Sequence, residues 1–162
     1  MKSVDDIKNL LSEIIGESKR VAVLGCGSPL RGDDGAGTLA AERLLNLSGN
    51  ARAFCGGTAP ENFTGEIKRF RPETLLVVDA ADTGSPPGEI AMIQIDNIDG
   101  ASFSTHMLPL NIMLDYLRDE TGCRVHILGI QGASLEFGAE MTKEVKTAVD
   151  TIVTALTEIL TE

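Results

Sequence analysis

The sequence predicts an α/β fold: a single-domain, three-layer α/β/α arrangement in which a five-stranded, mostly parallel twisted sheet lies between helices. Short apolar runs alternate with segments whose apolar residues recur at helical spacing, along most of the 162 residues. The short runs are apolar at consecutive positions, which is typical of strands covered by helices on both faces. The length suits one domain with a substantial core, so we expect a single domain over residues 1–162.

The first predicted element is an amphipathic helix that lies ahead of the sheet, within residues 1–16. Ser3 is placed to cap it, Asp6 follows three residues later, and Gly16 ends it. A β-α-β-α-β unit follows, with strands at 21–25, 51–56 and 74–80 and helices at 38–47 and 61–70.

The second half of the chain predicts one strand that runs against the others. Residues 81–88 are too few for a parallel crossover, which needs about a dozen residues, so the strand at 89–95 is expected to be antiparallel. A helix at 109–120, a strand at 124–130 and a long final helix follow. Thr142 is expected to cap that final helix.

Composition excludes several classes of protein. A formal net charge of -10 disfavours nucleic acid and anionic membrane surfaces, which attract basic proteins. The sequence shows no signal peptide and no apolar run of about 18 residues. We therefore expect a cytoplasmic location and no insertion into a membrane. The three cysteines form no C-x-x-C motif, and we expect reduced thiols.

The glycine-rich stretch LGCGSPLRGDDGAG, residues 24–37, resembles a nucleotide-binding loop but fails both common patterns. Leu30 occupies the position of the third glycine in a dinucleotide-binding fingerprint. Asp33 and Asp34 stand where a P-loop has Lys and Ser or Thr, and two carboxylates there would repel a polyphosphate. The loop is better suited to a cation, a proton or a peptide.

Three acidic residues and one histidine are expected at the carboxyl edge of the sheet, where α/β proteins bind ligands. Asp33 and Asp34 follow the first strand, Asp79 ends the apolar run LLVVD, and His106 lies in the loop before a helix. Carboxylate oxygens with one imidazole suit a borderline divalent metal such as Ni²⁺, Zn²⁺ or Co²⁺. The sequence therefore predicts an open metal site at this edge.

Simpler interpretations of the same residues remain open. Asp79 could cap a neighbouring loop, Asp33 and Asp34 could stabilise the next helix through its dipole, and His106 could be an ordinary loop histidine. Glu61 and the following Asn could line the cleft or cap their helix.

Cys26 lies beside the glycines, but a reactive thiolate needs positive surroundings and the acidic pair works against one. We therefore do not expect it to be a nucleophile.

Five segments together resemble the hydrogenase maturation endopeptidases, in the HycI-like branch that serves hydrogenase 3 and related [NiFe] hydrogenases. In chain order they are LGCGSPLRGDDGAG, GGTAPEN, RPETLLVVDAADTGSPPGEI, STHMLPLN and HILGIQ. The resemblance implies a phosphorylase/hydrolase-like α/β fold. It also implies a peptidase that removes a C-terminal extension from the large-subunit precursor after nickel insertion.

The resemblance also implies roles for individual residues. Asp34, Asp79 and His106 match the family's nickel contacts, and the nickel is expected to belong to the substrate, although zinc or cadmium could occupy the site in vitro. Asp34 and Asp79 are the candidate catalytic carboxylates, as in an aspartyl protease, and Asp33 is expected to support the loop. Candidate substrate-binding residues are Gly56, Gly57, Thr58 and Gln131.

Two features depart from the family pattern: Ser28 stands where an Asn is usual, and the helix within residues 1–16 is added. The expected partner is the hydrogenase large-subunit precursor, and the chain is expected to act as a monomer. Two other functions fit the same residues: a metal-dependent aminopeptidase-like hydrolase, and a non-enzymatic nickel-binding assembly chaperone.

Overall fold

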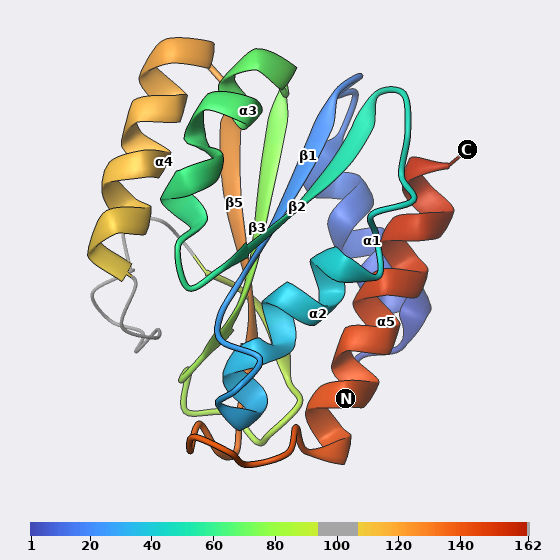
Figure 1. Ribbon diagram of the computed structural model, residues 1–162. Helices are drawn as coiled ribbons and strands as arrows, with labels where there is room; N and C mark the ends of the chain where they lie inside the picture. Colours follow the sequence, from blue (N-terminus) through green and yellow to red (C-terminus); the bar gives the residue numbers. More distant parts are fainter. Residues whose placement is uncertain (94–106, 162) are drawn as a thin grey trace.

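The computed structural model describes residues 1–93 and 107–161, and these build a five-stranded sheet in the order β2-β1-β3-β5-β4 (Figure 1). The strands are β1 (Val21–Cys26), β2 (Ala51–Gly57), β3 (Thr74–Ala81), β4 (Ile90–Ile93) and β5 (Arg124–Gln131). Only β4, at one edge, runs antiparallel to its neighbour. The predicted mixed sheet and its antiparallel strand are confirmed, while residues 94–95 of the predicted strand lie outside the described residues.

Helices cover both faces of this sheet. One face carries α1 (Val4–Ile15), α2 (Ala36–Glu42) and α5 (Lys143–Leu160), and the other carries α3 (Thr64–Phe70) and α4 (Met107–Thr121) (Figure 1). Successive strand residues alternate between the two apolar clusters, because side chains along a strand point to opposite faces. In β1, for example, Val23 packs with α5 while Leu24 packs on the side of α3 and α4.

The added N-terminal helix α1 is part of the core. Ser3 and Asp6 form the predicted capping box, and Gly16 ends the helix. Its apolar face buries Ile7, Leu11 and Ile15 in the cluster that contains α5. Burial of each such side chain contributes about 1.5–3 kcal/mol, so α1 stabilises the layer that it covers.

Helix α2 differs from its prediction at both ends. It spans Ala36–Glu42 rather than 38–47, and a 3₁₀ turn (Gly32–Gly35) precedes it. The early start depends on Gly37, where a Cβ atom would lie only 2.0 Å from the carbonyl oxygen of Val78. The first turn of α2 can therefore lie directly on the sheet. Beyond Glu42 the chain continues in tighter turns, such as the bond from Leu44 N to the Ala41 oxygen.

The predicted helix at 61–70 is also divided, into a 3₁₀ turn (Pro60–Phe63) and α3. No helix among residues 1–93 and 107–161 combines the length and the apolar character that crossing a bilayer requires.

Strand order creates a switch point between β1 and β3. The chain leaves β1 toward β2 on one side, and β3 lies on the other side with β5 beyond it. In α/β sheets a crevice for ligands opens at such a point, beyond the carboxyl ends of the strands. The loops after β1 and β3 therefore form the walls of the candidate site.

Candidate active site

The loop after β1 passes close to two acidic residues at Gly27. Its φ of 118° is in the region that favours glycine. A Cβ at this position would lie 1.7 Å from the backbone oxygen of Asp34 and 3.4 Å from Oδ1 of Asp79. The absence of a side chain at Gly27 thus allows the Asp34 loop and the Asp79 carboxylate to approach the same stretch of backbone.

The carboxylate of Asp34 is almost completely buried, and only one of its two oxygens has a hydrogen-bond partner among the described residues. Its Oδ2 accepts a hydrogen bond of 2.8 Å from the backbone N–H of Ser28. Its Oδ1 is buried with no hydrogen-bond partner among the described residues. A buried carboxylate oxygen without a donor is costly, so this position favours a cation or a proton donor supplied by a ligand.

Asp79 lies in β3 and is fully buried. Its Oδ1 accepts a 2.9 Å hydrogen bond from the N–H of Ala80. The alternation of the strand places it on the same face as Leu75 and Val77, which is the face covered by α3 and α4. This hydrogen bond joins Asp79 only to the next residue, so it neither supports nor contradicts the alternative that Asp79 caps a loop.

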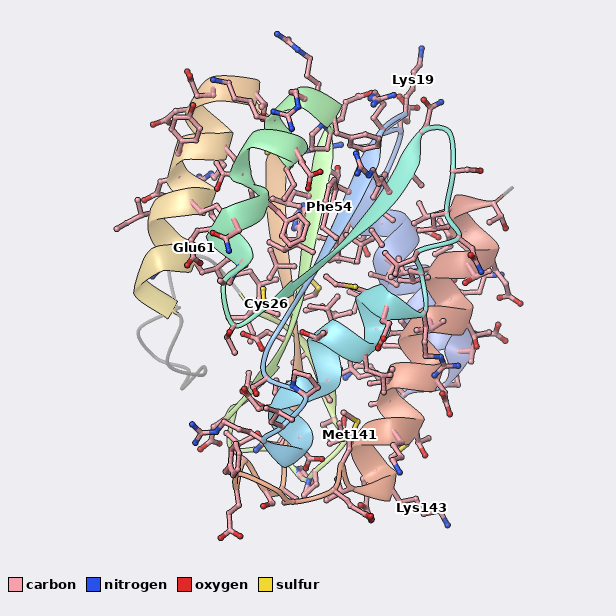
Figure 2. All side chains as sticks on the ribbon, in the orientation of Figure 1. Lys19, Cys26, Phe54, Glu61, Met141 and Lys143 are labelled. Carbon is pink, nitrogen blue, oxygen red and sulfur yellow. The ribbon has the colours of Figure 1, made fainter. Side chains whose placement is uncertain are left out.

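The pKa of the Cys26 thiol reflects the negative charge of this region. Burial raises its pKa well above the usual value, and the nearby carboxylates of Asp79, Glu61 and Asp34 raise it further. Cys26 is inside the molecule, and Glu61 is on the side covered by α3 and α4 (Figure 2). The charge around this neutral thiol is therefore negative, and the site is acidic.

The peptidase activity that the sequence resemblance implies is expected to stay within about twofold of the wild-type rate in Cys26→Ser, because a thiol with a raised pKa supplies almost no thiolate at neutral pH. Iodoacetamide should likewise leave activity unchanged. The measurement is the initial rate of peptide-bond cleavage, with circular dichroism as the check on folding. A folded but inactive variant would instead identify Cys26 as a nucleophile.

Asp33 has a different role from its neighbour. Its fully buried carboxylate accepts hydrogen bonds from the N–H groups of Ala133 (2.8 Å), Ser134 (3.3 Å) and Thr142 (2.7 Å). The hydroxyl of Thr142 adds a bond of 3.0 Å. Asp33 thus joins the loop after β1 to the segment between β5 and α5.

Two expectations about helix ends change as a result. Thr142 is the N-cap residue of α5 by position, but its hydroxyl makes no capping bond and binds Asp33 instead. The hydroxyl donates its hydrogen to the buried carboxylate, whereas a cap would require the hydroxyl oxygen to accept from an N–H in the first turn of α5. Asp33 and Asp34 lie in the 3₁₀ turn (Gly32–Gly35) directly before α2, so the alternative that they stabilise this helix through its dipole stays open. Glu61 is exposed and caps neither its own turn nor α3.

The candidate substrate-binding residues lie beside the same loop. The carbonyl of Gly57 accepts a 2.9 Å bond from Gly27 N, and a Cβ at Gly56 would be 2.8 Å from the Gly25 oxygen. Thr58 follows them and is exposed. This strand end therefore lies directly against the glycine loop, and its contact with substrate stays a prediction.

Gln131 is held by the loop after β3. Its Oε1 accepts a 2.7 Å bond from the N–H of Thr83, and its Nε2 donates to the Gly132 carbonyl at 3.0 Å. It lines a small cavity of about 160 Å³ together with Asp82 and Leu135, among others. The side-chain amide is thus engaged within the protein, and Gln131 lines this cavity at the carboxyl ends of β3 and β5, so its contact with substrate stays a prediction.

The predicted metal ligands are only partly placed. His106 lies outside the described residues, so its position relative to Asp34 and Asp79 stays a prediction. Within residues 1–93 and 107–161, no group of three His, Cys, Asp or Glu side chains is arranged to hold a metal ion. The described part of the site therefore supplies carboxylate oxygens, and one of them, Oδ1 of Asp34, has no hydrogen-bond partner among the described residues.

Sequence reasoning missed the segment at 132–142, which the structure brings to the site through Asp33. The signal was present in the stretch ASLEFG, where two large apolar residues, Leu135 and Phe137, stand in a segment with no predicted helix or strand. Both are exposed, at 42% and 78%.

Comparison with known proteins identifies similar chains. A family model described as hydrogenase maturation protease matches residues 39–159. The hydrogenase 3 maturation protease of Escherichia coli K12 is 44% identical over 80% of this chain and 85% of its own length. The solution structure of the endopeptidase HycI from Escherichia coli has a TM-score of 0.72 at 39% identity, covering 83% of this chain and 87% of its own.

A crystal structure from Thermococcus kodakarensis KOD1, of the [NiFe] hydrogenase maturation protease HycI, has a TM-score of 0.86 at 30% identity. The match covers 94% of this chain and 99% of that one.

Proposed function

Because this chain belongs to the hydrogenase maturation protease family and is a peptidase, we propose that it removes a C-terminal extension from the large-subunit precursor of a [NiFe] hydrogenase once nickel has been inserted. The family and the peptidase activity confirm what the sequence predicted. The large subunit as substrate, the dependence on nickel and the residues that carry out cleavage form the proposal.

The observation that carries the proposal is the buried carboxylate of Asp34, whose Oδ1 has no partner among the described residues. Asp79 lies close to the same loop, at the switch point of the sheet. Carboxylate oxygens and an imidazole, that of His106, are suitable ligands for Ni²⁺. In this proposal the metal arrives within the precursor and completes its coordination with these side chains, so that it acts as the recognition signal.

The same carboxylates suit peptide hydrolysis. A water molecule loses a proton to Asp34 or Asp79 as it attacks the scissile carbonyl. The C–N bond then breaks, and the proton passes to the leaving amine. The substrate's own nickel, held beside the scissile bond, would polarise the carbonyl. The buried, acidic surroundings favour a carboxylate as base over the thiol of Cys26, whose pKa is raised.

The test is incubation of the purified protein with nickel-loaded precursor, followed by mass spectrometry of the intact products. We expect one new, shorter large subunit and one released C-terminal peptide. Residues lost one at a time from the amino terminus would indicate an aminopeptidase. Stable binding without any change of mass would indicate an assembly chaperone, and either result would contradict the proposal.

A further inference from the structure

Three large apolar side chains project into solvent beside the candidate active site. Leu30, Leu135 and Phe137 are 63%, 42% and 78% exposed. Single exposed apolar residues are common on protein surfaces, but groups of them often mark interaction sites. The other large apolar side chains exposed in the described part of the chain are Met1, Leu45, Ile112 and Tyr116, which lie on other elements. We call Leu30, Leu135 and Phe137 the apolar rim.

Two loops form this rim and are bonded to each other. The N–H of Gly138 donates to the carbonyl of Leu30 at 2.8 Å, and Nε of Arg31 donates to the carbonyl of Leu135 at 3.2 Å. Asp33 adds a bond from its N–H to the Ser134 carbonyl at 2.8 Å, besides those of its carboxylate. The rim is therefore preformed, and binding to it requires little ordering of the loops.

The rim lies at the same carboxyl edge of the sheet as the candidate site. Leu30 belongs to the loop that carries Asp34. Leu135 lines the same cavity as Ala81, Asp82 and Gln131, at the carboxyl ends of β3 and β5. A polypeptide whose scissile bond lies beside Asp34 and Asp79 must extend across one of the surfaces around them, and the rim is an apolar surface at that place.

We propose that the apolar rim binds an apolar segment of the substrate polypeptide next to the scissile bond, which gives the enzyme affinity for its precursor separately from the metal contacts. This inference rests on the proposed function. A second copy of this chain is a poorer occupant, because two chains of formal charge -10 repel each other. An apolar segment of the precursor fits both the chemistry and the position.

The experiment compares the double variant Leu30→Ser/Phe137→Ser with Leu45→Ser, a matched control at a 56% exposed leucine in the turn after α2. Calorimetry measures the Kd for nickel-loaded precursor, and steady-state kinetics give KM and kcat. We expect Kd and KM to rise about tenfold or more in the double variant with kcat unchanged, because buried aromatic anchors dominate interfaces. Leu45→Ser should match the wild type.

Unchanged Kd and KM in a folded double variant would overturn the proposal. A wild-type protein that self-associates in sedimentation, and ceases to do so in the double variant, would also overturn it, because the rim would then be an interface between copies. Failure of the proposed function has a different signature: wild-type protein that binds the precursor without cutting it. The Kd comparison would still decide the role of the rim in that case.

Discussion

Asp34→Asn and Asp79→Asn are each expected to slow precursor cleavage by about 10²- to 10⁴-fold, the range that removal of a general base or a comparable charged group produces. Asn keeps the shape of the side chain and removes the negative charge. In Asp34→Asn the remaining oxygen can still accept the bond from Ser28 N, so the loop should keep its conformation. The loss of rate would then reflect chemistry or nickel recognition rather than folding.

The measurement is single-turnover cleavage with enzyme in excess over precursor, followed by mass. Glu61→Gln is the matched control, since this exposed carboxylate also lies near Cys26 but makes no capping bond, and its rate should stay within a few fold of wild type.

The thermal midpoint of Asp34→Asn should equal or exceed that of the wild type, because a buried charge with an unpartnered oxygen is removed. Near-normal rates in both Asn variants would contradict the assignment of the two carboxylates.

Asp33→Ala is expected to destabilise the fold by about 3–5 kcal/mol, among the largest effects of a single substitution. The change leaves the N–H groups of Ala133, Ser134 and Thr142 and the Thr142 hydroxyl without their acceptor. The segments that it joins lie about 100 residues apart in the chain, so no local contact replaces it. Urea unfolding followed by circular dichroism measures the loss.

Asp33→Asn provides the graded control. Its amide oxygen can accept hydrogen bonds from one pair of donors, such as the N–H groups of Ala133 and Ser134, while its NH₂ group faces the N–H and hydroxyl of Thr142. We therefore expect about half the loss of stability seen with alanine. Thr142→Val removes only the hydroxyl and should cost about 1 kcal/mol. If Asp33→Ala unfolds at the wild-type urea concentration, Asp33 does not hold the two loops together.

Most of the fold could be predicted because local patterns determine it. The consecutive apolar residues of β3 indicate a strand covered on both faces, and the short segment 81–88 indicates the antiparallel turn into β4. Gly16 and the Ser3–Asp6 box set the ends of α1 through local bonds alone. Where residues close together in the sequence determine an element, the sequence alone predicts that element.

The roles of Asp33 and Asp34 could not be separated in this way. The two residues are adjacent and chemically identical, and they differ only in what lies around them after folding. Asp33 meets donors from the segment between β5 and α5, whereas Asp34 meets one N–H from Ser28 and retains an open oxygen. The start of α2 was misplaced for a similar reason, because it depends on the contact of Gly37 with Val78 in β3.

The most direct test of the account is cleavage of matched precursors, one nickel-loaded and one nickel-free, by enzyme stripped of metal beforehand. Electrospray mass spectrometry of the large subunit reports loss of its C-terminal extension. We predict that only the nickel-loaded precursor is shortened, because the open oxygen of Asp34 gains its partner from the substrate's metal. Equal cleavage of both precursors would contradict the account, and Asp34 and Asp79 would then act as a metal-independent acid and base.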